Sequence, residues 1–269
     1  MNKDLKIGFI GCGKMASAII NGIISSGLTD KGNIIASEVS ADVAQSASER
    51  LGIRVMADNK QLVKESDIVF LVTKPNIVTE ILQEIKTHLS DDKLLVSIPA
   101  GVTFAKIENI IGKRRVVRVM PNTPALILEG MSGICKGEKA TDEDLAVVDE
   151  ILSNIGKTIT VTEDKMDIVT AISGSGPAFF YKVIEDIARA GEKLGLDYEK
   201  SLQLALQTAK GAAKMIENRN GTAVQTLIDN VATKGGCTFV GISVMNDENS
   251  DRLFYDVIEQ TTVKASQLG

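Results

Sequence analysis

The glycine-rich segment near the amino terminus is the first part of the sequence whose residue types and spacing point to chemistry. Gly11-Cys12-Gly13-Lys14-Met15 follows an apolar run and leads at once into a helical pattern. In this setting Gly11 permits a tight turn, Gly13 lets a pyrophosphate approach the backbone, and the amides of the helix N-terminus attract its charge. The order of strand, glycine loop and helix therefore predicts that all five residues contact a dinucleotide.

An acidic residue, Glu38, stands at the end of the next predicted strand. Its spacing from the glycine loop suits a carboxylate that accepts hydrogen bonds from the hydroxyls of the adenosine ribose. No arginine occupies this turn to meet a 2′-phosphate, although Lys60 lies in the following loop. We therefore expect NADH or NADPH as the cofactor, with NADH preferred. The alternative is that Glu38 is a solvated loop residue.

Two proline-containing segments follow later strands, at the edge where open α/β sheets bind ligands. Thr73-Lys74-Pro75 comes after one strand, and Arg118-Val119-Met120-Pro121-Asn122-Thr123-Pro124 includes the end of another. Pro121 and Pro124 should hold the chain in an extended loop, from which Asn122 presents its amide to a polar group. Met120 either borders the ligand or fills a gap in the core.

A third segment, Gly174-Ser175-Gly176-Pro177-Ala178, comes just before a helical pattern. Its glycines allow a close approach to the backbone, and Ser175 is a candidate N-cap of the helix. Together the three segments resemble the pyrroline-5-carboxylate reductase family, and the resemblance extends over the whole chain. It implies a Rossmann domain followed by a helical domain that interlocks with a second subunit.

The resemblance also implies contacts between single residues and the cofactor. Met120, Pro121 and Asn122 would border the nicotinamide, and Asn59 would lie near the adenosine. The remaining residues on the nicotinamide side would be Thr73, Lys74, Pro75, Ala100 and Gly101.

The loop Ala232-Thr233-Lys234-Gly235-Gly236-Cys237-Thr238 resembles the family's remaining motif, with two changes. The family usually has proline where Lys234 stands and a small or hydroxyl residue where Cys237 stands. Successive backbone amides in such a loop suit the carboxylate of a cyclic imino acid. The resemblance therefore implies a substrate site that runs from Thr233 to Thr238 and includes Ser175 and Gly176. Lys234 either adds a cation to this site or points to solvent.

The implied reaction is hydride transfer to the C=N carbon of 1-pyrroline-5-carboxylate, which gives L-proline. The substrate nitrogen carries the required proton, so no strong protein acid is expected. Thr238 would hydrogen-bond the ring nitrogen, and we assign a catalytic role to it alone. The single histidine, His88, lies outside the motifs and is expected at the surface.

Three other functions stay open. The first is a paralogue that reduces another cyclic imine, such as piperideine carboxylate, with Lys234 as a specificity residue. The second is the β-hydroxyacid dehydrogenase class, whose Lys-x-x-Asn segment is poorly matched because Lys182 is followed at that spacing by Glu185. The third is a non-catalytic nucleotide-binding regulator, which only the altered loop supports.

The elements that must position these motifs alternate over the first half of the chain, as parallel strands joined by crossover helices do. Strands are expected at 6–10, 33–38, 68–72, 94–98, 115–120, 131–136 and 157–161. Helices are expected at 15–26, 41–51, 61–65 and 76–88 and, with Thr141 as N-cap, at 142–155. Beyond Glu163 only helical patterns follow, among them 178–194 and 198–216. The last of these is apolar around much of its circumference and is expected to be buried, inside an oligomer if not within the chain.

These elements predict an α/β protein with two domains. Residues 1–162 should form a Rossmann dinucleotide-binding domain with a mostly parallel sheet. Residues 163–269 should form an all-helical dimerisation and substrate domain. A chain of 269 residues is long for a single compact core, which agrees with this division.

Composition narrows the classes of function. The chain is 44% hydrophobic and 24% charged, has no apolar run that spans a bilayer, and does not begin like a secreted protein. Three separated cysteines, Cys12, Cys135 and Cys237, predict neither a disulfide framework nor a metal site. The net charge of −5 is spread along the chain, so nucleic-acid binding is not expected. We expect a cytoplasmic homodimer or a larger homo-oligomer, such as a pentamer of dimers.

Overall fold

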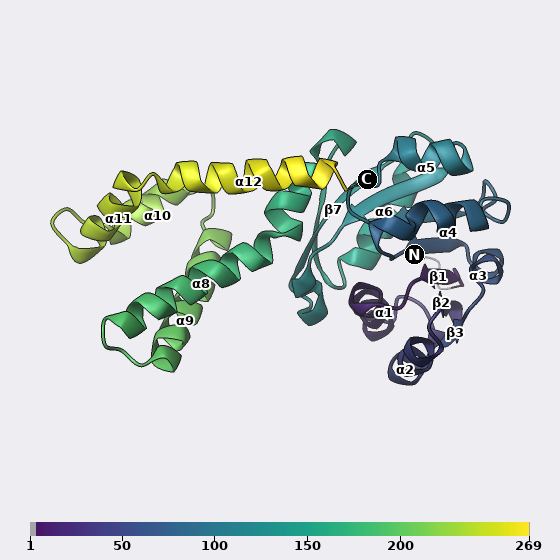
Figure 1. The fold of residues 1–269 in the computed structure, drawn as a ribbon, viewed down its shortest axis with the longest axis horizontal. Helices are drawn as coiled ribbons and strands as arrows, with labels where there is room; N and C mark the ends of the chain where they lie inside the picture. Colours follow the sequence, from purple (N-terminus) through teal and green to yellow (C-terminus); the bar gives the residue numbers. More distant parts are fainter. Residues whose placement is uncertain (1–3, 269) are drawn as a thin grey trace. The chain divides into compact units, whose positions relative to one another are not determined.

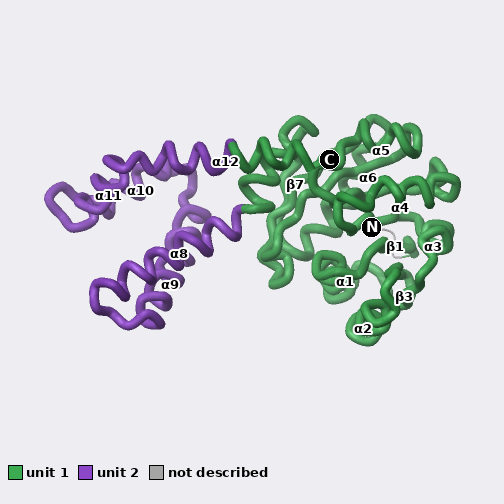
Figure 2. The backbone as a smooth tube through the Cα atoms, viewed as in Figure 1, with its two compact units in different colours: residues 1–175, 260–269 green, residues 176–259 purple. Residues whose placement is uncertain are grey.

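The structure is a computed structural model that describes residues 4–268. The chain divides into two compact units (Figure 2). The first comprises the residues up to 175 together with those from 260 onward, and the second comprises residues 176–259. The domain boundary predicted from the sequence, between residues 162 and 163, stays a prediction.

The first unit is built on one eight-stranded sheet in the order β3-β2-β1-β4-β5-β6-β7-β8 (Figure 1). Every neighbouring pair is parallel except β6 and β7, which confirms the mostly parallel sheet. The order reverses between β1 and β4, and such a switch point is where ligands bind in open α/β sheets. The strands are β1 (Ile7–Ile10), β2 (Ile34–Ser37), β3 (Arg54–Met56), β4 (Ile68–Leu71), β5 (Leu94–Ser97), β6 (Arg115–Met120), β7 (Gly130–Lys136) and β8 (Gly156–Thr160).

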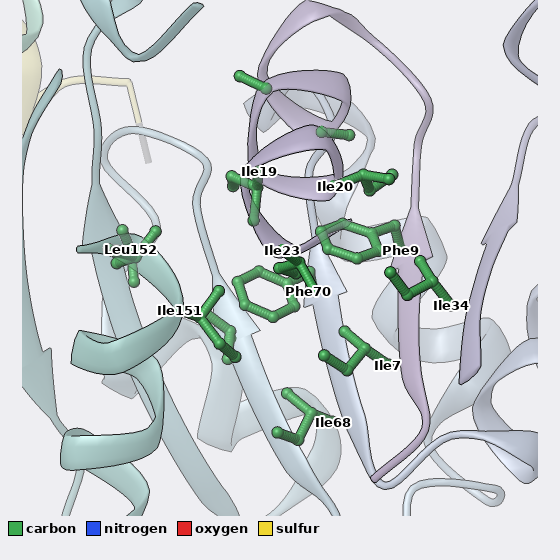
Figure 3. Close-up of a cluster of buried hydrophobic side chains, with 14 of the residues drawn as sticks. Ile7, Phe9, Ile19, Ile20, Ile23, Ile34, Ile68, Phe70, Ile151 and Leu152 are labelled. Atoms are coloured by element: carbon green, nitrogen blue, oxygen red, sulfur yellow. The ribbon is translucent and has the colours of Figure 1, made fainter. Parts of the chain in front are cut away.

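Helices cover both faces of this sheet, so the central strands are apolar on both sides. In β4, Ile68 and Phe70 belong to the core on one face, whereas Val69 and Leu71 belong to the core on the other. Figure 3 shows the first of these cores, where the rings of Phe9 and Phe70 stack at a centroid distance of 4.8 Å. Its helices are α1 (Lys14–Ser26), α2 (Ala41–Leu51) and α6 (Asp142–Leu152). The opposite core is covered by α3 (Asn59–Glu65), α4 (Val78–Ile85) and α5 (Phe104–Ile111).

Among the strands of the sheet and the helices that cover it, β3 and α5 were missed from the sequence. The strand β3 has only three residues, too few for a periodic pattern to stand out. The helix α5 carries its own start signal, because the Thr103 side chain accepts a hydrogen bond from the main-chain amide of Lys106. The predicted cap of α6 is confirmed, since Thr141 and Asp144 form a reciprocal capping box.

Two local predictions near the expected site are wrong. The extended loop suggested by Pro121 and Pro124 ends at Asn122, because residues Thr123–Ile127 form a 3-10 helix. Ser175 is not an N-cap, since its backbone is helical and its amide donates to the Thr170 carbonyl at 2.8 Å. That bond spans five residues and closes a π-helix, Thr170–Gly174, which continues α7 (Met166–Val169).

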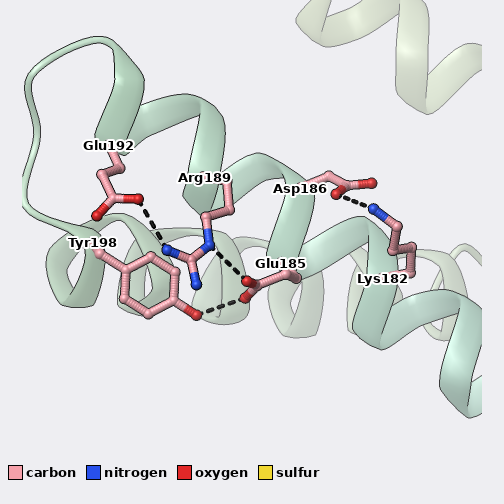
Figure 4. Close-up of polar contacts among 6 residues, drawn as sticks. All are labelled: Lys182, Glu185, Asp186, Arg189, Glu192 and Tyr198. Atoms are coloured by element: carbon pink, nitrogen blue, oxygen red, sulfur yellow. Dashed lines mark hydrogen bonds and ion pairs between the residues drawn. The ribbon is translucent and has the colours of Figure 1, made fainter.

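The second unit is entirely helical in the residues described, which confirms the prediction that helices alone follow the α/β part of the chain. Its helices are α8 (Gly176–Lys193), α9 (Tyr198–Glu217), α10 (Val224–Val231), α11 (Cys237–Asp247) and the first part of α12 (Ser250–Ser266). Helices α8 and α9 form a hairpin joined by a polar cluster (Figure 4). Glu185 accepts hydrogen bonds from Tyr198 at 2.6 Å and from Arg189 at 2.8 Å, and the Arg189 guanidinium lies 4.3 Å from the centre of the Tyr198 ring.

The helix α9 is not buried within one chain, contrary to one part of the prediction made for it. Only Ser201 and Ala205 of this helix are buried. Its large apolar side chains Leu204, Leu206 and Met215 are 55–63% exposed. Burial of this helix therefore requires a second chain.

Candidate functional site

The glycine loop lies at the carboxyl end of β1, beside the switch point of the sheet. Gly11 has a φ of 101°, and a Cβ there would lie 2.5 Å from the Val72 carbonyl oxygen. Only glycine fits without displacing the backbone. At Gly13, the N-cap of α1, a Cβ would meet no atom within 4 Å. The space above Gly13 and the first turn of α1 therefore fits a pyrophosphate held by main-chain amides.

A cavity of about 490 Å³ opens from the glycine loop toward β2. It contains seven of the residues predicted to bind the cofactor, which are Gly11, Cys12, Gly13, Glu38, Asn59, Thr73 and Lys74. In a doubly wound sheet this is the side that receives the adenosine.

The Glu38 carboxylate lies over the glycine loop at the edge of this cavity. It accepts hydrogen bonds from the main-chain amides of Cys12 at 3.4 Å and Val39 at 3.0 Å. Glu38 is half-buried, so it differs from a fully solvated loop residue. The position suits acceptance of ribose hydroxyls.

A second cavity, of about 410 Å³, lies over the carboxyl ends of β4, β5 and β6. It shares Gly13, Thr73 and Lys74 with the first cavity, so the two adjoin at the glycine loop. The predicted cofactor residues that only this cavity contains are Lys14, Met15, Pro75, Ala100 and Met120. Together the two cavities bring twelve of the thirteen predicted cofactor residues to one edge of the sheet.

Met120 fills a place in the core, as one interpretation predicted, and that it borders the ligand stays a prediction. The residue is 6% exposed and packs in the core beneath the sheet edge, and it also lines the second cavity. Its sulfur would lie 3.4 Å from a Cβ at Gly174, which brings the end of β6 against the π-helix.

Asn122 lines neither cavity. Its side-chain amide donates to the carbonyl and hydroxyl oxygens of Ser173 at 3.2 and 3.3 Å, and its oxygen accepts from the Met131 amide at 2.9 Å. The side chain therefore holds the protein's own backbone in place, and sequence reasoning did not find this arrangement.

A partly buried ion pair that sequence reasoning missed lies under the same edge. Arg118 is 3% exposed, and its guanidinium donates to Glu163 at 2.6 Å. The same carboxylate oxygen accepts from the main-chain amide of Phe104 at 2.7 Å. An arginine within an apolar strand requires an acidic partner, which is the signal that could have revealed the pair. The pair joins β6 to α5 and to the 3-10 turn at Glu163–Lys165.

The Cys12 thiol in the glycine loop is 2% exposed. Burial, together with the negative charge of Glu38, raises the pKa of Cys12 to about 11. The thiol is therefore neutral near pH 7 and adds no charge beside the phosphate cradle.

The predicted substrate residues fall in both units. Ser175 is in the first unit and Gly176 begins the second. In the second unit Thr233 and Gly236 close a turn through a main-chain hydrogen bond of 2.9 Å, with Gly235 at a φ of 81°. Cys237 and Thr238 begin α11. Within this chain Lys234 and Cys237 are exposed and Thr238 is half-buried.

Between residues 4 and 268, no three histidine, cysteine, aspartate or glutamate side chains gather as a metal site would require. No helix in the described part of the chain has the length and apolar character to span a membrane.

Comparison with known proteins agrees with this geometry. A family model for pyrroline-5-carboxylate reductase dimerisation matches residues 163–268, and one for NADP oxidoreductase, coenzyme F420-dependent, matches residues 6–101. A pyrroline-5-carboxylate reductase of Methanosarcina acetivorans is 40% identical over 268 residues, which is 99% of each chain.

Solved structures of pyrroline-5-carboxylate reductases are also similar to this chain. A pyrroline-5-carboxylate reductase of Coxiella burnetii has a TM-score of 0.91 at 33% identity, with 99% of each chain covered. The pyrroline carboxylate reductase of Plasmodium falciparum, solved with NADP bound, has a TM-score of 0.89 at 34% identity and the same coverage. With similarity over nearly its whole length, this chain belongs to the pyrroline-5-carboxylate reductase family.

Proposed function

We propose that this chain reduces 1-pyrroline-5-carboxylate to L-proline, the last step of proline synthesis, with NADH or NADPH as the reductant. One structural observation carries the proposal: two adjoining cavities run along the sheet edge from Glu38, past Gly13, to Met120. This arrangement suits an extended dinucleotide whose two halves lie on either side of the switch point. The relatives that match nearly the whole chain are named pyrroline-5-carboxylate reductases, after this reaction.

The cofactor supplies the hydride, and the protein supplies binding and orientation. Main-chain amides at Gly13 and the first turn of α1 hold the pyrophosphate. Pro75, Ala100 and Met120 border the cavity on the nicotinamide side, and their apolar surfaces keep water from the reacting face.

The substrate is held by the loop that precedes α11. The main-chain amides of Gly235 and of the first turn of α11 bind its carboxylate, with Thr233, Gly236, Cys237 and the Lys234 ammonium beside them, while Ser175 and Gly176 complete the site. Thr238 hydrogen-bonds the ring nitrogen, which already carries the proton that the product needs. Catalysis then rests on the orientation of the imine carbon toward the nicotinamide rather than on a protein acid.

We further propose that NADH is the preferred reductant. The Glu38 carboxylate lies after β2 beside the glycine loop, and its negative charge would repel the 2′-phosphate of an NADPH bound with its ribose there. The relative from P. falciparum was solved with NADP bound, so this preference rests on Glu38 of this chain alone.

The active form is proposed to be a cytoplasmic homodimer or a larger homo-oligomer, including a pentamer of dimers. Within a single chain the second unit leaves many large apolar side chains exposed, such as Phe180 at 69% and Val240 at 62%. Surfaces of this kind mark protein interfaces. The family model that matches residues 163–268 describes dimerisation.

A second candidate is the reduction of a six-membered cyclic imine, which Lys234 favours because the family usually has proline there. The test is the oxidation of NADH and of NADPH by the purified chain with 1-pyrroline-5-carboxylate and with piperideine carboxylate. We expect faster turnover with the five-membered ring. Faster turnover with the six-membered ring would assign the second function. Cofactor binding with no imine-dependent oxidation would indicate a nucleotide-binding regulator.

A further inference from the structure

Helix α4 presents a stripe of side chains to the cavity on the adenosine side. Ile77, just before the helix, and Glu80, Ile81 and Glu84 within it all line this cavity. Their spacing of three, four and seven residues puts them on one helix face. Two isoleucines therefore offer apolar contact, and two carboxylates lie beside them.

Glu84 differs from Glu80 because its carboxylate is held in place. The side-chain amide of Asn59 donates to Glu84 Oε2 at 2.9 Å, and the Ser37 hydroxyl donates to Asn59 Oδ1 at 2.6 Å. Ser37 and Asn59 are 1% and 8% exposed. An ionised carboxylate only accepts hydrogen bonds, so the NH2 group of Asn59 must face Glu84 and its oxygen must face Ser37.

This chain of hydrogen bonds leaves one acceptor of Glu84 unused. Across residues 4–268, Oε1 of Glu84 accepts no hydrogen bond, whereas Oε2 is bound to Asn59. Glu84 is half-buried at the cavity wall, so its side chain has lost part of its hydration. A carboxylate with a fixed orientation and a spare acceptor favours a ligand that carries an N–H donor.

The lining of the cavity favours the base of the dinucleotide as that ligand. With the pyrophosphate proposed at Gly13 and the ribose at Glu38, the lining left for the base is the stripe on α4. Adenine is flat and largely apolar, and its exocyclic amino group is a donor. Contact with Ile77 and Ile81 suits its faces, and Glu84 suits its amino group.

We propose that Glu84, oriented by Asn59, accepts a hydrogen bond from the exocyclic amino group of adenine and so selects adenine over bases with a carbonyl oxygen at that position. The inference rests on the proposed dinucleotide function and adds the residue that recognises the base. Asn59 is then a positioning residue that acts through Glu84.

The test compares the binding of NADH with that of reduced nicotinamide hypoxanthine dinucleotide, in which a carbonyl oxygen replaces the amino group. Dissociation constants are measured by calorimetry on the full-length protein without imine. We expect the wild-type protein to bind NADH about tenfold more tightly, because the carbonyl oxygen would face the Glu84 carboxylate. In Glu84→Gln, whose amide can donate to that oxygen, the ratio should fall to about one or reverse.

Glu80→Gln is the matched control, because it removes the same charge from the same helix face without touching the hydrogen bonds of Asn59. It should leave most of the wild-type ratio intact. Equal affinities of the wild-type protein for the two dinucleotides, or equal effects of the two substitutions, would overturn the proposal.

Two further measurements distinguish failure of this inference from misfolding of a variant and from failure of the proposed function. Thermal unfolding of each variant shows whether it is folded, and the wild-type ratio tests the proposal even if Glu84→Gln does not fold. A wild-type protein that oxidises NADH with 1-pyrroline-5-carboxylate but does not discriminate between the bases contradicts this inference alone. Failure to bind either dinucleotide contradicts the proposed function itself.

Discussion

The side chain of Asn122 and the backbone of Ser173 are joined by a hydrogen bond of 3.2 Å between residues 51 positions apart. The Ser173 hydroxyl donates in turn to the Met131 carbonyl at 3.1 Å, and the Met131 amide donates back to Asn122 at 2.9 Å. This closed ring links the end of β6, the start of β7 and the π-helix. Asn122, Met131 and Ser173 therefore hold both the cavity edge next to Met120 and the backbone that leads into Ser175.

Asn122→Ala should destabilise the protein by about 1–3 kcal/mol, because it leaves the Met131 amide and the Ser173 carbonyl without their partner. Urea unfolding measures this free energy. Asn76→Ala is the control, since Asn76 is exposed and is expected to change stability by less than about 0.5 kcal/mol. Equal stability of the two variants would show that the ring does not stabilise the fold.

Thr238→Ala should lower kcat roughly a hundredfold, because it removes the proposed hydrogen bond to the substrate ring nitrogen. The dissociation constant for NADH should not change. Steady-state kinetics with 1-pyrroline-5-carboxylate and calorimetry with NADH measure the two quantities. Thr238→Ser keeps the hydroxyl and should retain most of the turnover. Wild-type turnover in the alanine variant would remove Thr238 from the mechanism.

Glu38→Gln should lower the KM for NADPH about tenfold, which corresponds to about 1.4 kcal/mol, because the charge that repels the 2′-phosphate is gone. The KM for NADH should change less, since the amide oxygen can still accept from a ribose hydroxyl. Glu49→Gln on the exposed face of α2 is the control for net charge. A wild-type protein with the lower KM for NADPH would contradict the proposed NADH preference.

Asp144 should make stability depend on pH in the acid range. Burial alone would raise the pKa of Asp144, but hydrogen bonds from Arg115 and Thr141 outweigh it and hold this pKa below its usual value of 3.8. A carboxyl group with a depressed pKa stabilises the fold fully above its unfolded value, and the effect is lost as the pH falls through the folded value.

Asp144→Asn should therefore cost about 2 kcal/mol at pH 7, and the difference from wild type should shrink as the pH falls below about 4. Urea unfolding as a function of pH measures it. Asp142→Asn, in the same helical turn but with an exposed side chain, should cost much less. A difference between Asp144→Asn and wild type that does not depend on pH would refute the linkage.

The cysteines of the first unit should resist alkylation. Burial raises the pKa of both Cys12 and Cys135 to about 11 from an ordinary value of 9.0. At pH 8 their thiolate fraction is then roughly a hundredfold below that of an ordinary thiol, apart from the loss of access. Peptide mass spectrometry after iodoacetamide treatment of the native protein should find both unmodified, whereas urea should expose them. Rapid labelling of Cys12 in the native protein would contradict its burial.

The local patterns of the sequence determined much of this protein. Seven of the eight strands, the glycine loop and the capping box at Thr141 were predicted, because each depends on residues that are close together in the chain. The carboxyl ends of parallel strands meet at one edge, so the same reasoning located the groups around Gly13 that line the two cavities.

Only the tertiary structure decided what the buried polar side chains do. Asn59 bonds to Glu84 and Ser37, Asn122 to Ser173, and Arg118 to Glu163, across 22 to 51 positions of sequence. A single sequence does not pair such residues, because their partners are set by how the helices pack on the sheet. The π-helix at Thr170–Gly174, which replaces the predicted N-cap at Ser175, was missed for the same reason. Its one extra residue per turn depends on packing against Met120 and Asn122 rather than on local sequence preference.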